Sequence, residues 1–186
     1  MKTERSIPCE RLPGALNTFL PLDIAVLSCR EVRPEFHARY HSLGKEYIYK
    51  IFNSRIRSPF WEGLAYQFPY ALDVEKLDRC ARRFLGAHDF RAFCAAGGDL
   101  HDTVRTISES RVAREGDLVT YTVRGDGFLY KMVRIMTGTL LLAAAGRLDE
   151  EDISEILKTG DRSRACRTAP AHGLYLNRVF YNEADF

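Results

Sequence analysis

Three segments of the sequence combine glycine, aromatic and charged residues in ways that packing alone does not require. These segments are residues 36–49, 125–138 and 161–176. In the first, Tyr47 and Tyr49 alternate along a predicted strand, beside Arg39 and Lys45. Rings that stack on a base, next to cations that contact its phosphate, are the usual means of holding unstacked nucleotides. Tyrosines two residues apart also line the core face of many sheets, so their spacing leaves both interpretations open.

Arg134 interrupts an otherwise apolar predicted helix. A buried guanidinium needs a carboxylate partner, because an unpaired buried charge carries a heavy desolvation cost. The sequence therefore predicts either that Arg134 is exposed or that it faces a carboxylate in an active-site cleft.

Metal and cofactor chemistry have little support. The chain has no GxxxxGK[ST] loop, no GxGxxG after a strand and no HExxH. The ligand-type residues at 99–102 are more typical of a turn than of a metal site. The five cysteines are odd in number and form no CxxC pair, which argues against a zinc ribbon, a redox dithiol and a disulfide framework. We expect no metal and no cofactor.

Composition and charge are those of an ordinary globular protein. Hydrophobic residues make up 46% and charged residues 28% of the chain, and the net charge is +2, so any nucleic-acid site must be a local patch. The positive excess lies within Arg30–Arg57, which holds seven basic and three acidic residues. This segment is either a solvated basic edge or a strip that faces phosphates.

Apolar runs and the first residues of the chain indicate a location. The longest apolar run, Leu140–Ala145, is too short to span a bilayer, and the first twelve residues are charged where a signal peptide is apolar. We therefore expect a soluble protein in the reducing cytoplasm, without a membrane partner.

Hydrophobic periodicity predicts the elements that position these residues. Strands are predicted over 23–29, 46–52, 104–114, 118–124 and 174–181, and helices over 11–20, 73–85, 128–144 and 149–158. Asp73 is a predicted N-cap, although Lys76 stands where a capping box has Glu or Gln, and Gly86 is a predicted C-terminal cap. Strands and helices mix without regular βαβ alternation. The predicted class is therefore α+β, a mixed or antiparallel sheet with helices packed on it.

An ordered set of six segments resembles the tRNA pseudouridine synthase A family, the uridine isomerases of the anticodon arm. The segments run along nearly the whole chain: FHARY (36–40), KEYIY (45–49), HDFRAFCAAG (88–97), VRTI (104–107), GDGFLYKMVR (125–134) and TAPAHGLYL (168–176). Any one of them alone would be a weak signal, whereas the ordered set is highly specific.

The resemblance implies a mechanism without cofactor or metal. Members flip a uridine at tRNA positions 38–40 out of the stack, cleave its glycosidic bond, rotate the base and rejoin it through carbon. By motif position, Tyr47 resembles the tyrosine that packs against the target base, and Leu174 resembles an apolar wall of the uridine pocket. Arg134 resembles the arginine that pairs with the catalytic carboxylate. Arg39 and Lys45 fit contacts to the tRNA backbone.

The nucleophile is where the sequence departs from the family. Members carry it as the aspartate of a G-R-T-D-A-G-V-H motif, which these 186 residues do not contain. The aspartates at 99, 102, 126 and 161 lie in predicted loops or turns, so none is a credible replacement. We expect residues 1–40 to be a remnant of the N-terminal synthase domain and residues 41–186 to form the C-terminal pseudouridine synthase domain.

Two functions follow as expectations. The first is the C-terminal part of a tRNA pseudouridine synthase, inactive alone because it lacks the nucleophile. The alternative is a non-catalytic tRNA-binding, RNA-binding or structural remnant. The expected partners are tRNA, through its anticodon arm, and a second copy of the chain in a homodimer.

Overall fold

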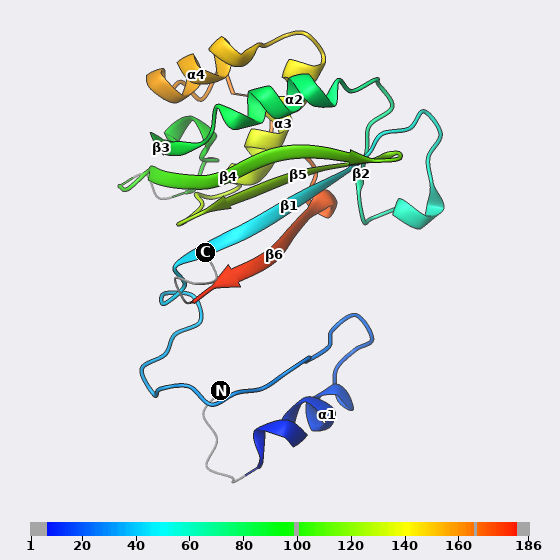
Figure 1. The fold of residues 1–186 in the computed structure, drawn as a ribbon, viewed down its shortest axis with the longest axis vertical. Coiled ribbons are helices and arrows are strands. Elements are labelled where there is room, and N and C mark those ends of the chain that lie inside the picture. The colour runs from blue at the N-terminus through cyan, green and yellow to red at the C-terminus, as the bar shows by residue number, and fades with distance from the viewer. Residues whose placement is uncertain (1–6, 99–100, 166, 182–186) are drawn as a thin grey trace. The chain divides into compact units, whose positions relative to one another are not determined.

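The computed structural model describes residues 7–98, 101–165 and 167–181 (Figure 1). The chain divides into two compact units, Met1–His41 and Ser42–Phe186. The larger unit contains the sheet and the helices that pack on it.

The smaller unit has little regular structure in its described part. A 3-10 turn at Cys9–Arg11 leads into helix α1, Leu12–Asn17, which is shorter than the predicted helix. The strand predicted over 23–29 is wrong: Val26 exchanges both of its backbone hydrogen bonds with the side chain of Asn17. A strand needs a neighbouring strand to satisfy its backbone, and the described residues of this unit provide none.

The larger unit is built on one six-stranded mixed sheet. Its strands are β1 (Gly44–Phe52), β2 (Tyr66–Gln67), β3 (Gly86–Asp89), β4 (Val104–Glu115), β5 (Leu118–Gly125) and β6 (Leu174–Phe180). The order β1-β5-β4-β3 is antiparallel throughout. Beyond β1, β6 pairs antiparallel with residues 44–49 and β2 pairs parallel with residues 51–52. The α+β class and the mixed sheet are thus confirmed, while the short strands β2 and β3 were not predicted.

Helices α2 (Val74–Arg82), α3 (Met132–Ala144) and α4 (Glu150–Thr159) cover one face of the sheet (Figure 1). Asp73 caps α2 by accepting a hydrogen bond from the backbone of Lys76, as predicted. The helix predicted from residue 128 begins four residues later, because Lys131 adopts a left-handed backbone with a φ of 59°. Gly86, expected to cap α2, instead opens β3 with a φ of 97°.

The core lies between the sheet and these helices. Its centre includes Tyr121 of β5, which is 1% exposed. The hydroxyl groups of Tyr121 and Ser110 lie 3.1 Å apart, and Ser110 donates to the carbonyl of Ala81 at 2.7 Å. This short chain of hydrogen bonds satisfies the buried hydroxyl groups and ties β5, β4 and α2 together.

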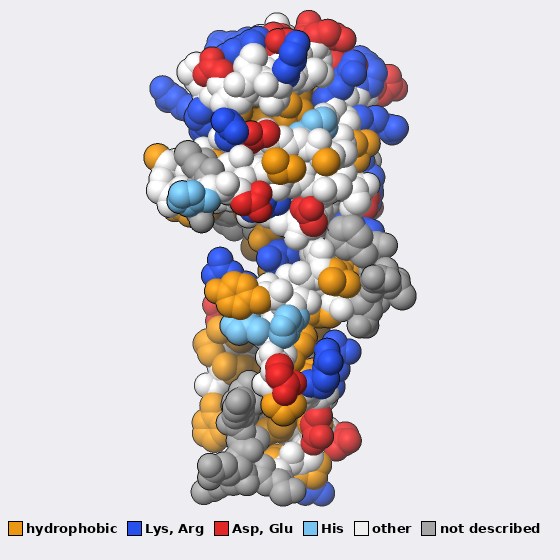
Figure 2. Space-filling model, turned by 90° about the vertical axis from the view of Figure 1, so that its left-hand side faces the viewer, with side chains coloured by type: hydrophobic (Ala, Val, Ile, Leu, Met, Phe, Trp, Pro, Cys, Tyr) orange, Lys and Arg blue, Asp and Glu red, His pale blue; other side chains and the backbone are white. Residues whose placement is uncertain are grey.

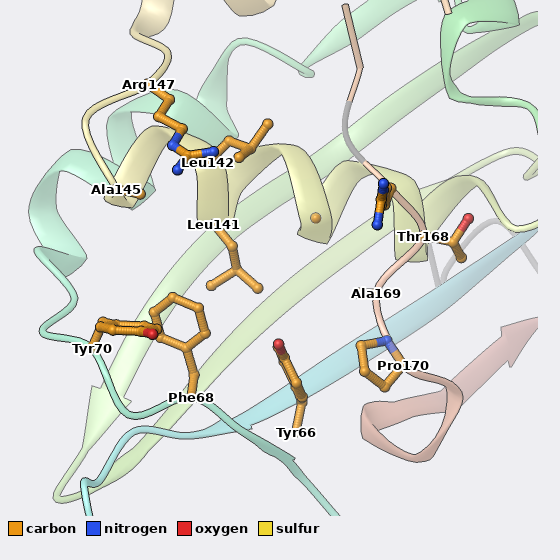
Figure 3. A pocket seen from close by; sticks show the side chains of 12 residues that line it. Tyr66, Phe68, Tyr70, Leu141, Leu142, Ala145, Arg147, Thr168, Ala169 and Pro170 are labelled. Atoms are coloured by element: carbon orange, nitrogen blue, oxygen red, sulfur yellow. The ribbon is translucent and has the colours of Figure 1, made fainter. Parts of the chain in front are cut away.

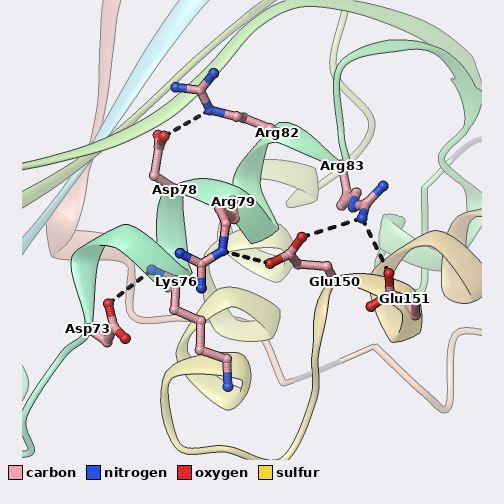
Figure 4. Close-up of polar contacts among 8 residues, drawn as sticks. All are labelled: Asp73, Lys76, Asp78, Arg79, Arg82, Arg83, Glu150 and Glu151. Atoms are coloured by element: carbon pink, nitrogen blue, oxygen red, sulfur yellow. Dashed lines mark hydrogen bonds and ion pairs between the residues drawn. The ribbon is translucent and has the colours of Figure 1, made fainter.

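Ion pairs join α2 to α4 at the surface (Figure 4). Arg79 lies 2.9 Å from Glu150, and Arg83 reaches Glu150 at 3.3 Å and Glu151 at 3.4 Å. Because these groups are partly exposed, the pairs contribute little to stability. The pairs align the two helices more than they stabilise them.

Candidate active site

Strand β1 directs Tyr47 and Tyr49 to the helix-covered face of the sheet. Directly paired residues lie on the same face, and Tyr49 pairs with Tyr121 and with Leu174. Tyr49 is fully buried, whereas Tyr47 is half-buried. Each interpretation of the tyrosine spacing therefore applies to one of the two residues: Tyr49 belongs to the core, and Tyr47 keeps an accessible surface.

Tyr47 lies at the edge of the core. Its ring centroid is 5.1 Å from that of Phe128, with the ring planes at 82°, an edge-to-face contact. Leu174 is half-buried and packs against the same core. Burial raises the pKa of Tyr47, which favours the neutral form of its hydroxyl group. Tyr47 thus offers a fixed ring with a neutral hydroxyl group.

Arg134 lies in the first turn of α3 and is held by Ala169. Its Nε donates to the carbonyl of Ala169 at 2.7 Å, and the backbone N–H of Ala169 donates to the carbonyl of Arg134 at 3.0 Å. Arg134 is half-buried, and none of the carboxylates in the described part of the chain forms an ion pair with it. The guanidinium is therefore oriented by the backbone, and the described residues supply no counter-charge.

One buried tyrosine supports this arrangement. The hydroxyl of Tyr49 donates to the carbonyl of Pro170 at 2.8 Å, next to the residue that holds Arg134. The turn Ala171–Gly173 then packs on the ring, so closely that a Cβ on Gly173 would lie 2.7 Å from Cζ of Tyr49. Burial raises the pKa of Tyr49, Tyr66 adds to the rise, and the nearby charge of Arg134 opposes it.

The connection from Tyr49 to Arg134 was not predicted. In the sequence, only the glycine in TAPAHGLYL indicated this connection. A tyrosine's partner 121 residues away is not encoded in any local pattern.

The two predicted RNA-binding residues lie in different units. Lys45 is the second residue of β1, two residues before Tyr47 and on the same face, and it is half-exposed. Arg39 belongs to the smaller unit, where its guanidinium carbon lies 5.8 Å from the centroid of the Tyr40 ring. The basic segment Arg30–Arg57 is likewise divided between the units. On the face that Figure 2 shows, basic and acidic side chains of the larger unit are intermixed.

Glu46 lies on the opposite face of β1 and is engaged there. Arg124 binds it at 2.8 Å, and the side-chain amide of Asn177 also donates to it. Burial by itself would raise the pKa of Glu46, but these hydrogen bonds outweigh burial and lower it. Glu46 is therefore a structural carboxylate that points away from Tyr47.

The loop aspartates have structural contacts too. Asp102 pairs with Arg105 at 3.3 Å, Asp126 accepts from the backbone N–H of Thr106 at 3.0 Å, and Asp161 accepts from the backbone N–H of Ser163 at 2.8 Å. Asp99 lies outside the described residues.

The described residues contain neither a metal-binding cluster nor a membrane-spanning helix. No group of three or more His, Cys, Asp or Glu side chains there could hold a metal ion. No helix in that part of the chain is both long and apolar enough to cross a membrane.

Known proteins align with nearly the whole of this chain. The family described as "tRNA pseudouridine synthase" matches residues 80–182. The "tRNA pseudouridine synthase A 2" of Clostridium tetani is 45% identical over 181 residues, which are 97% of this chain and 73% of the relative. The "tRNA pseudouridine synthase A" of Halalkalibacterium halodurans is 46% identical over 95% of this chain and 67% of its own length. That of Bacillus subtilis is 43% identical over 97% and 73%.

These matches include the segments that carry Tyr47, Arg134 and Leu174, and they agree with the resemblance of the six motifs. The family acts on tRNA, so tRNA is the substrate class that membership implies. The chain belongs to the tRNA pseudouridine synthase family.

Proposed function

We propose that this chain binds the anticodon arm of tRNA and holds a uridine of positions 38–40 beside Arg134. The observation that carries the proposal is the state of Arg134. A half-buried guanidinium, oriented by Ala169 and without a carboxylate among the described residues, is prepared to pair with an external carboxylate.

Each of the other site residues has a role in binding the uridine. The target base must leave its stack, at a cost of a few kcal/mol, and a preformed surface offsets part of that cost. The half-buried ring of Tyr47 packs against the flipped base, and Leu174 forms an apolar wall. Lys45 and Arg39 contact backbone phosphates.

The chain orients the substrate and the carboxylate but does not attack the substrate. In the reaction the glycosidic bond breaks, the base rotates, and a carbon–carbon bond forms between base and ribose. This step needs the family's nucleophilic aspartate, whose motif these 186 residues lack. We therefore propose that the chain alone forms no pseudouridine.

Complementation in trans tests the proposal. The chain is mixed with the part of the Bacillus subtilis relative that it does not match, and pseudouridine is measured in a tRNA transcript. We expect product only from the mixture, and at least a tenfold loss with Arg134→Gln. The matched control is Arg111→Gln, because Arg111 lies on β4 and pairs with Glu109. Robust turnover by the chain alone would refute the proposal, as would equal turnover by the two variants.

Binding is measured separately, because the alternative function, a non-catalytic RNA-binding remnant, predicts tRNA binding without product in the mixture. Replacing both Arg39 and Lys45 by Ala should weaken tRNA binding and reduce its salt dependence by about one unit of slope for each lost phosphate contact. An unchanged slope would contradict their assignment.

We also propose that the protein works in the cytoplasm, where its tRNA substrate is, and that two copies associate. Exposed apolar side chains support association, among them Leu176 on β6, which is 52% exposed. Sedimentation velocity tests this point. A monodisperse monomer at high concentration would refute it.

A further inference from the structure

A cavity of about 560 Å³ lies beside the candidate active site (Figure 3). Helix α3 provides its floor, and the segments around 66–70 and 167–170 provide its walls. It is lined by Tyr66, Phe68, Tyr70, Gly138, Leu141, Leu142, Ala145, Arg147, Arg167, Thr168, Ala169 and Pro170. This volume is within the usual range for a small-molecule site.

The cavity continues from the site along α3. Arg134, Gly138, Leu141 and Ala145 follow one another at helical spacing, so they share one face of the helix. Leu141 lies seven residues beyond Arg134, which is about 10 Å along the axis. Ala169, which holds Arg134, also lines the cavity. A ligand in the cavity is therefore close enough to belong to the same RNA strand as a base at Arg134.

One wall of the cavity is aromatic. The ring centroids of Tyr66 and Phe68 are 6.1 Å apart, and those of Phe68 and Tyr70 are 5.5 Å apart with the planes at 70°. Tyr70 is 72% exposed, so the wall is open to solvent. The hydroxyl of Tyr66 points into the cavity (Figure 3). Such a wall offers ring faces and a polar handle to a flat heterocycle.

The charge of the lining is purely positive. Among the described residues, it contains Arg147 and Arg167 and no Asp or Glu. Other arginines of this unit, such as Arg79 and Arg164, pair with carboxylates. Arg147 and Arg167 form no ion pair with a carboxylate of the described residues. Exposed guanidinium groups without a carboxylate partner, next to aromatic rings, suit a phosphate attached to a base.

We propose that this cavity binds a second nucleotide of the tRNA, with its base on the Tyr66–Tyr70 wall and its phosphate at Arg147. The inference rests on the proposed function for the identity of the RNA, but not for the binding itself. Positive charge without an acidic neighbour favours a nucleotide over an apolar polypeptide segment as the occupant.

Mononucleotide titration tests the proposal. Adenosine 5′-monophosphate, adenosine and inorganic phosphate are each titrated into the chain, and binding is followed by NMR chemical shifts. The nucleotide should bind more tightly than either part. Tyr70→Ala and Arg147→Gln should each weaken it about fivefold or more, and Arg147→Gln should also reduce the salt slope by about one. Both side chains are exposed, so the variants should keep the fold, which circular dichroism checks.

Controls separate this inference from the proposed function. Tyr130→Ala, at a 51% exposed tyrosine outside the cavity lining, and Arg111→Gln should leave nucleotide affinity unchanged. Arg134→Gln should reduce product at least tenfold in the complementation assay, whereas Tyr70→Ala and Arg147→Gln are compared in mononucleotide binding, which needs no product. If complementation fails while the cavity variants still weaken binding, only the proposed function is refuted.

Three results would overturn the inference. In the first, phosphate alone binds as tightly as the nucleotide, which indicates a non-specific anion patch. In the second, Tyr70→Ala leaves nucleotide affinity unchanged. In the third, the cavity variants alter self-association in sedimentation experiments without altering nucleotide affinity, which indicates a protein-binding surface instead.

Discussion

The hydrogen bond from Tyr49 to Pro170 gives the sharpest test of how the site is held. Tyr49→Phe keeps the ring and removes only the hydroxyl group. The bond is 2.8 Å long and its donor residue is 0% exposed, so water cannot easily replace it. Leaving this part-buried carbonyl without its partner costs about 1–3 kcal/mol. We expect the free energy of unfolding to fall by this amount.

Tyr175→Phe is the matched control. The hydroxyl of Tyr175 also donates to a backbone carbonyl, that of Leu64 at 2.6 Å, but at a solvent-accessible position. Water can take the place of this hydroxyl group, so the loss should stay below about 1 kcal/mol.

Urea denaturation followed by circular dichroism measures both variants. The midpoint should move and the m-value should stay constant, because the surface exposed on unfolding is unchanged. Equal losses in the two variants would refute the reasoning that burial sets the energy of the Tyr49 bond, as would an unaffected Tyr49→Phe.

Three further perturbations have defined outcomes. Gly173→Ala places a methyl group 2.7 Å from the ring of Tyr49, so thermal denaturation should show the free energy of unfolding reduced by about 1–3 kcal/mol. An unchanged stability would mean that the turn can shift freely. Burial raises the pKa of Tyr121, so as the pH rises the unfolded chain loses the hydroxyl proton before the folded chain does. The free energy of unfolding should therefore fall above about pH 10, and it should fall less steeply in Tyr121→Phe. The pKa of Glu46 is lowered in the folded state, so its contribution to the free energy of unfolding should disappear as the pH falls below about 4. Glu46→Gln also weakens the pair with Arg124, and in urea titrations at several pH values its stability should depend less on pH in this acidic range.

Much of the fold could be predicted because its patterns are local. The alternation in KEYIYKIF gave β1, and Asp73 gave the start of α2. The pattern failed for 23–29, where an apolar run has no neighbouring strand among the described residues of its unit and stays irregular. It also missed β2 and β3, which are two and four residues long and so too short to show a period.

The site was predicted in its residues but not in its geometry. Motif order singled out Tyr47, Arg134 and Leu174, and the structure places all three in the larger unit, on or beside the helix-covered face of the sheet. Their roles in binding uridine stay predictions. The hydrogen bonds between Ala169 and Arg134 join positions 35 residues apart and could not be inferred from spacing.

The sequence by itself determined the family, the α+β class and the absence of the family's nucleophile motif, because ordered motifs, periodicity and residue identity are properties of the chain. Only the tertiary structure decided which tyrosine is core and which is accessible, and what holds Arg134. It also brought the aromatic and arginine residues of one cavity together from segments about 100 residues apart. The physical reason is that burial and long-range hydrogen bonds arise when distant segments pack, and local sequence does not record that packing.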